Sequence, residues 1–120
     1  MKELVTHWFE QTAPFQGILA CGLRHPDQTA VSKTWADGFP EVAVDNAIRC
    51  AADLFQVLNM NRLAAGRVRW IYQGGILCCE RRSDGTCLGV FIPKDESMVD
   101  LDGVERFFGE FQALAKGAPV

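Results

Sequence analysis

Three segments of the chain place apolar residues at the spacing of an amphipathic helix. Residues 41–60 form the longest of them, and residues 100–116 form the last. Pro14 ends the first helix because the residue before a proline is pushed out of the α region, and Pro40 is placed to open the second. The first segment, residues 2–12, has its apolar stripe at Leu4, Val5, Trp8 and Phe9.

The segments between the helices have the short apolar runs and the turn residues of strands. Residues 15–22 and 29–35 flank a turn, and three more runs follow at 67–73, 75–82 and 87–93. In the last two runs both alternating faces are apolar, so the sheet needs cover on both sides. We therefore expect an α+β fold of three layers in the order α-β-β-α-β-β-β-α. A five-stranded antiparallel sheet would lie between the central helix and the two terminal helices.

Length and charge limit the class of protein. With 120 residues, we expect one domain over residues 1–116 and a flexible tail at 117–120. A net charge of −3 without a basic stripe argues against nucleic-acid binding. The longest apolar run is far shorter than a membrane span, and Met1-Lys2-Glu3-Leu4 lacks the build of a signal peptide. Five cysteines without a CxxC pair are typical of reduced thiols, so we expect a cytoplasmic protein.

The long helix and the strand at 67–73 both carry apolar residues beyond those that one core needs. The helix has a second, weaker stripe on its outer side, which predicts cover by another chain or by a neighbouring loop. The strand is aromatic and would be a liability as an exposed edge, whereas pairing with its copy would satisfy its backbone groups. The predicted dimer interface consists of Ala43, Asn46, Cys50, Asp53, Val57, Met60, Val68, Trp70 and Tyr72.

No segment has the spacing of a catalytic, cofactor-binding or metal site. The chain lacks an HExxH motif, a Gly-rich phosphate loop and a GxSxG elbow. His7 and His25 have no Cys or carboxylate at ligand spacing, so we expect solvated histidines. Cys78 and Cys79 are neighbours in a strand and should point to opposite faces as small buried hydrophobes. We therefore expect no enzyme, no cofactor and no metal.

Two charged runs are expected to be solvated. Arg81-Arg82 should solubilise a hairpin turn, with a phosphate or partner contact as the alternative. Lys94, Asp95 and Glu96, with the acids that follow them, should form a loop and a helix N-terminus, where acids favour the dipole.

The order of elements resembles that of the Roadblock family of dynein light-chain and GTPase-regulator domains. Residues 15–22, FQGILACG, look like the first strand of that family. Residues 66–92, GRVRWIYQGGILCCERRSDGTCLGVFI, look like its closing meander. The resemblance implies a homodimer or heterodimer in which the long helices lie side by side and the third strands pair. It also implies a non-enzymatic platform for a small Ras-like GTPase. The polar residues expected to contact this partner are Asp45, Arg49 and Gln56, with Asp53 beside them.

Three alternatives to this function stay open from the sequence. A profilin-like sensor module would hold a small ligand between the sheet and a helix. A scaffold subunit of a larger complex would need no GTPase. An enzyme of a class that shows no recognised motif is the third.

Overall fold

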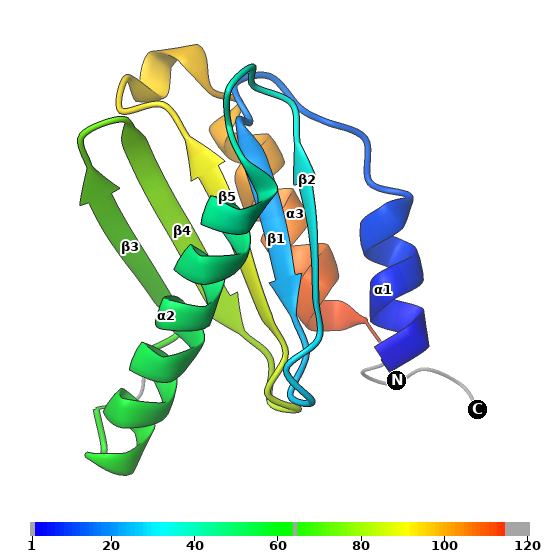
Figure 1. Cartoon of the computed structure of the whole chain (residues 1–120), viewed down its shortest axis with the longest axis vertical. Helices are drawn as coiled ribbons and strands as arrows, with labels where there is room; N and C mark the ends of the chain where they lie inside the picture. The colour runs from blue at the N-terminus through cyan, green and yellow to red at the C-terminus, as the bar shows by residue number, and fades with distance from the viewer. Residues whose placement is uncertain (1, 64, 115–120) are drawn as a thin grey trace.

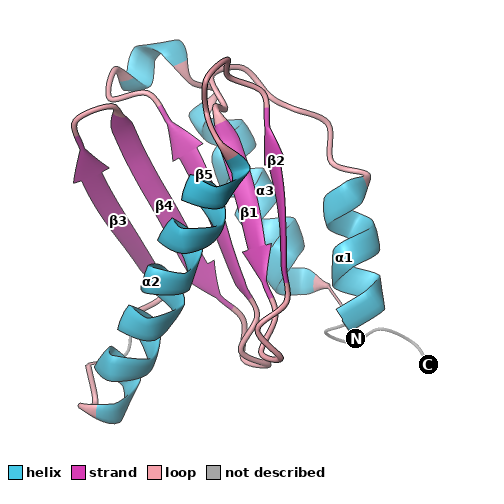
Figure 2. Cartoon of the chain, viewed as in Figure 1, coloured by secondary structure: helices cyan, strands magenta, loops and turns pink. Residues whose placement is uncertain are grey.

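The computed structural model describes residues 2–63 and 65–114, and its elements follow the predicted order (Figures 1 and 2). The predicted tail at 117–120 lies outside the described residues. No helix of the described part combines the length and the apolar character that crossing a bilayer requires. The helices and strands are α1 (Lys2–Glu10), β1 (Ala20–Arg24), β2 (Ala30–Thr34), α2 (Glu41–Met60), β3 (Arg67–Tyr72), β4 (Gly75–Arg81), β5 (Cys87–Ile92), the 3₁₀ helix η1 (Glu96–Met98) and α3 (Leu101–Ala113).

The five strands form one antiparallel sheet in the order β2-β1-β5-β4-β3, which confirms the predicted fold class. The meander β3-β4-β5 brings β5 next to β1, so the last strand along the chain lies in the centre of the sheet. The strands β2 and β3 form the two edges. The long helix α2 connects these two edge strands by crossing one face of the sheet (Figure 1).

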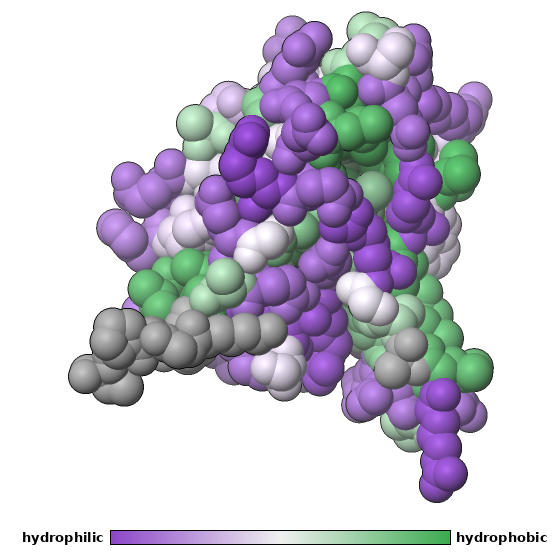
Figure 3. Space-filling view, turned by 180° about the vertical axis from the view of Figure 1, so that it is seen from behind, coloured by the Kyte–Doolittle hydropathy of each residue, from purple (hydrophilic) through white to green (hydrophobic). Residues whose placement is uncertain are grey.

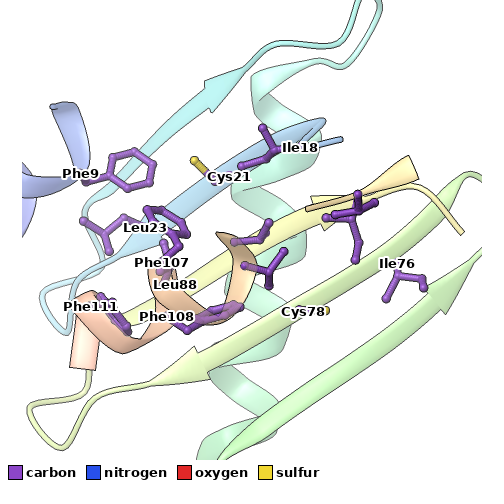
Figure 4. Packing of buried hydrophobic residues seen from close by; sticks show 14 of the residues in the cluster. Phe9, Ile18, Cys21, Leu23, Ile76, Cys78, Leu88, Phe107, Phe108 and Phe111 are labelled. Atoms are coloured by element: carbon purple, nitrogen blue, oxygen red, sulfur yellow. The ribbon is translucent and has the colours of Figure 1, made fainter. Parts of the chain in front are cut away.

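Two hydrophobic clusters, one on each face of the sheet, confirm the three layers. On one face α1 and α3 pack over a cluster that includes Phe9, Cys78 and Phe108 (Figure 4). On the other face α2 packs over a cluster that includes Ile48 and Cys79. Cys78 and Cys79 are both buried and belong to opposite clusters, as predicted from the alternation of side chains along a strand.

A pair of glycines lets α2 approach the sheet closely. Gly22 of β1 and Gly89 of β5 are cross-strand neighbours on the face under α2. A Cβ atom at Gly22 would lie 2.8 Å from Cγ1 of Val44, and a Cβ atom at Gly89 would overlap Cδ1 of Ile48. The buried residues Val44 and Ile48 therefore pack directly on the backbone of the two central strands.

The first strand begins later than the sequence predicts. Residues 15–22 were expected to be extended, but the chain turns at Gln16 and Gly17, and β1 starts at Ala20. Gly17 has a φ of +88°, and a Cβ atom there would lie 2.6 Å from the carbonyl oxygen of Met98. Because Met98 is distant from Gly17 in the sequence, the residues around Gly17 do not predict this turn. The turn is fixed further by a hydrogen bond from the amide of Asp100 to the carbonyl of Gln16, of 2.9 Å.

Two side chains expected in solvent are buried. Arg82 does not solubilise a turn: its guanidinium donates to the carbonyls of Phe111 and Leu114, the latter at 2.7 Å, and so satisfies the end of α3. His25 is not solvated either, because its Nε2 lies 2.8 Å from Oγ1 of Thr6 on α1. His7 and Arg81 are exposed, as predicted.

The charged run after β5 forms capped helix starts. Residues 94–96 were expected to be a solvated loop, but Glu96 begins η1, and the carboxylate of Asp95 accepts from the amide of Ser97 at 3.1 Å. Asp100 caps α3 by accepting from the amide of Gly103 at 3.0 Å. The prediction of acids at a helix N-terminus is confirmed, because a carboxylate there satisfies free amides.

We expect Gly89→Ala to lower the free energy of unfolding by about 1–3 kcal/mol, because its new methyl group must displace Ile48 or α2. Urea unfolding followed by circular dichroism measures this change. The matched control is Gly109→Ala in α3, where a Cβ atom meets nothing within 4 Å. That change should stabilise the helix by up to about 1 kcal/mol. Equal unfolding midpoints for the two variants would contradict the close packing of α2.

Candidate interaction surface

The strand β3 is an open edge of the sheet. It pairs with β4 through positions such as Trp70 opposite Leu77, and no other described strand pairs with its outer side. Val68, Trp70 and Tyr72 alternate toward the face that α2 covers, because their partners Cys79 and Leu77 belong to the cluster under α2. The edge thus presents a row of aromatic side chains together with unpaired backbone groups.

The helix α2 leaves the side of the sheet next to this edge uncovered. It packs mainly against β1, and it crosses the sheet diagonally, so that its first turns lie away from β3 and its last turns lie on the β3 side (Figure 1). Between the helix and the edge strand lies a groove of about 330 Å³, which we call the α2–β3 groove. Its lining residues are almost entirely apolar: Phe39, Ala43, Ala47, Cys50, Trp70, Tyr72, Leu77 and Phe91.

Aromatic rings form the floor and one wall of the α2–β3 groove. The ring of Phe91 meets Phe39 edge-on with centroids 4.9 Å apart, and it meets Tyr72 in the same way at 6.2 Å. Burial raises the pKa of Tyr72 above its ordinary value. Trp70 stands at the outer rim and keeps 48% of its surface exposed. Such a large apolar side chain beside an apolar groove is typical of a binding surface.

The structure brings four of the nine predicted interface residues together in the α2–β3 groove: Ala43, Cys50, Trp70 and Tyr72. Val68 is half-buried on the same face of β3. Asn46, Asp53, Val57 and Met60 are exposed on α2, and Val57 and Met60 expose 54% and 75% of their surfaces. The predicted second stripe of α2 is therefore uncovered by this chain. Whether another chain covers it stays a prediction.

The end of α2 extends past the sheet and carries further apolar surface (Figure 3). Met60 and Leu63 are exposed there. A second, more polar hollow of about 480 Å³ lies between these last turns of α2 and the hairpin turns. Asp53, Gln56 and Met60 line it, together with Arg24 and Arg81.

The residues predicted to contact a GTPase lie on α2 without forming a cluster of their own. Arg49 and Gln56 are exposed, and Asp45 is half-buried. The Oδ1 atom of Asp45 is buried and has no hydrogen-bond partner in the described part of the chain. None of the three lines the α2–β3 groove.

The lining of the α2–β3 groove is almost entirely apolar and is suited to hydrophobic contacts. No charged side chain lines it. Within residues 2–63 and 65–114, no three His, Cys, Asp or Glu side chains gather to hold a metal ion. Burial raises the pKa of Cys21 to about 12 and that of Cys87 to about 11, so both thiols are protonated at neutral pH and are weak nucleophiles.

Sequence reasoning missed half of the lining of the α2–β3 groove. Phe39 lies in the loop before α2 and carries no periodic signal. Ala47 has the spacing of the core stripe, and Leu77 and Phe91 have the alternation of buried strand residues. Their patterns predict burial and give no sign of the groove, because its position depends on the angle at which α2 crosses the sheet.

Comparison with known proteins identifies the fold. No family model and no curated protein matches the chain. Among solved structures, the crystal structure of a Roadblock/LC7 domain from Streptomyces avermitilis is similar with a TM-score of 0.61, over 92% of this chain and 90% of that chain. The fold is that of a Roadblock/LC7 domain. The two sequences are 13% identical, so the similarity to the Roadblock/LC7 domain concerns the fold alone.

Proposed function

We propose that this Roadblock-like chain is a non-enzymatic adaptor or regulator that forms a dimer and binds a small Ras-like GTPase. The observation that carries the proposal is the α2–β3 groove beside the open edge of β3. An apolar groove and an unpaired edge on the same side of one chain favour cover by protein. The Roadblock/LC7 fold of the structural neighbour supports the same class of function.

In the proposed dimer the two β3 strands pair and the two α2 helices lie side by side. Pairing the edges satisfies backbone groups of Arg67–Tyr72 that otherwise bind water. The second copy lays the outer stripe of its α2, including Cys50 and Val57, against the groove and buries Trp70. An aromatic residue at the centre of such a contact is the type that dominates interface energies.

The GTPase would contact the polar residues of α2, which remain at the rim of the dimer. Arg49 is an exposed cation, and Gln56 lies two turns further along the helix. The resemblance of the sequence to the Roadblock family supports a Ras-like partner. Because the described residues of the groove contain no acid–base pair, the chain would act by positioning its partner and not by its own chemistry.

The dimer predicts that Trp70→Glu raises the dissociation constant at least about 100-fold, because it places a charge in an apolar contact. Size-exclusion chromatography with light scattering measures the loss of dimer. The matched control is Ile71→Glu, since Ile71 is also exposed on β3 but points to the opposite face. A wild-type chain that stays a monomer at micromolar concentration argues against the proposal, as does a dimer that Trp70→Glu leaves intact.

If the gene next to this one encodes a Ras-like GTPase, the purified GTPase should co-elute with the dimer. We expect Arg49→Glu to weaken this binding about tenfold while the dimer persists, because a reversed rim charge acts mainly on association with the partner. The control is Arg106→Glu on α3, at the opposite face of the sheet. If the GTPase fails to bind in both its GDP and its GTP state, the dimer is an adaptor for another protein.

A second candidate function is a sensor module that holds a small apolar ligand. The α2–β3 groove favours it, because a volume of about 330 Å³ is in the range of small-molecule sites. Under this alternative, native mass spectrometry of the purified chain should show a monomer with a constant added mass. A dimer without added mass would exclude it and support the first proposal.

A further inference from the structure

His25 is the buried one of two histidines in the chain. It follows β1 directly, and only 3% of its surface is exposed. Its Nε2 lies 2.8 Å from the hydroxyl oxygen of Thr6, which belongs to α1. Its Nδ1 is also buried and has no hydrogen-bond partner among the described residues. The ring thus joins α1 to the sheet through one nitrogen and leaves the other buried and unpaired among the described residues.

Charged groups from several elements lie near the ring. Lys2 and Glu3 come from α1, Asp27 from the turn between β1 and β2, and Asp84 from the turn between β4 and β5. Arg24 of β1, Asp53 of α2 and Arg81 of β4 line a hollow together with His25. No carboxylate oxygen of Asp27 or Asp84 lies within 4.0 Å of a ring nitrogen of His25, and each aspartate has another partner. Asp27 binds the ammonium group of Lys2 at 2.7 Å, and Asp84 accepts from the amide of Thr86 at 2.9 Å. Both carboxylates keep their charge but are bound to other groups, so they would attract an imidazolium only from beyond ion-pair distance.

Protonation of His25 is unfavourable while α1 is docked. Burial lowers the pKa of His25 below its ordinary value, and the charge of Lys2 lowers it further, against an opposing effect of Asp27, Asp84 and Glu3. A lowered histidine pKa means that the site stabilises the fold fully above pH 6.5 and loses this contribution as the pH falls toward the folded value. The pKa of each of the three carboxyl groups is itself lowered, so they remain ionised across this range.

The helix α1 is the element that we expect to undock from the sheet. It has nine residues, too few to be stable alone in water. Val5 and Phe9 are its buried side chains, and Phe9 points toward Cys21 and Leu23 (Figure 4). Trp8 stacks on Phe107 of α3 with centroids 4.9 Å apart. By contrast α3 has one anchor that does not involve α1, because Arg82 binds its last carbonyls.

We propose that His25 is a pH-sensitive latch: when its ring takes up a proton, α1 leaves the sheet and uncovers the apolar surface beneath Trp8 and Phe9. Undocking removes Thr6 and Lys2 from the ring and lets water reach both nitrogens. The surface that opens includes Cys21, Leu23 and Phe107. It lies on the face opposite to the α2–β3 groove, so the latch does not depend on the proposed dimer.

Hydrogen exchange of the α1 amides tests the latch on the full chain between pH 7.5 and 5.0, after correction for the intrinsic pH dependence of exchange. We expect the opening constant of residues 6–11 to rise by up to about tenfold per pH unit below 6.5, while the amides of β1 and β5 keep their protection. His7→Gln, in the same helix, is the matched control and should behave as the wild type. His25→Gln should abolish the pH dependence.

A titration of the wild-type chain by NMR provides a second measurement that needs no variant. The ring protons of His25 should titrate below the ordinary histidine value. The latch is overturned if His25 titrates at or above the ordinary histidine value. It is also overturned if His25→Gln keeps the pH-dependent opening of α1, or if the central strands lose protection in parallel with the helix.

Discussion

The close contact between α2 and the paired glycines Gly22 and Gly89 determines the arrangement of this chain. With no side chains at these two positions, Val44 and Ile48 rest on the backbone of β1 and β5. The contact fixes the helix over the β1 half of the sheet and fixes its angle of crossing. The helix does not cover the β3 side of the sheet completely, and the α2–β3 groove lies there.

A single helix cannot cover five strands. A helix with its side chains is about 10–12 Å wide, whereas five strands spaced about 4.8 Å apart span roughly 20 Å. On the opposite face the two helices α1 and α3 share the same task and enclose three phenylalanines of α3, namely Phe107, Phe108 and Phe111. The face under α2 is therefore covered incompletely next to β3. There Trp70 keeps 48% of its surface exposed, and the buried residues Leu77 and Phe91 line the groove.

The sequence predicted the elements well where their signals are local. Pro40 and the periodic apolar residues fix α2 at Glu41–Met60, and the Gly and Asp-Gly turns fix the last three strands to within one residue. The failures arise where distant segments meet. Gly17 turns against Met98, and Arg82 reaches the end of α3 across 29 residues of sequence. Neither contact leaves a pattern in its neighbours, so the start of β1 and the burial of Arg82 could not be predicted.

The open edge of β3 distinguishes the two occupants proposed for the groove. A small apolar ligand can fill the space among Phe39, Cys50 and Trp70, but it leaves the amides and carbonyls of the edge strand unpaired. A second copy supplies both an apolar helix face and a strand with matching backbone groups. An exposed apolar edge strand can pair with other chains and cause aggregation. A partner that covers both the groove and the edge removes this risk, whereas a ligand in the groove alone does not. The geometry of groove and edge thus favours a protein over a small molecule.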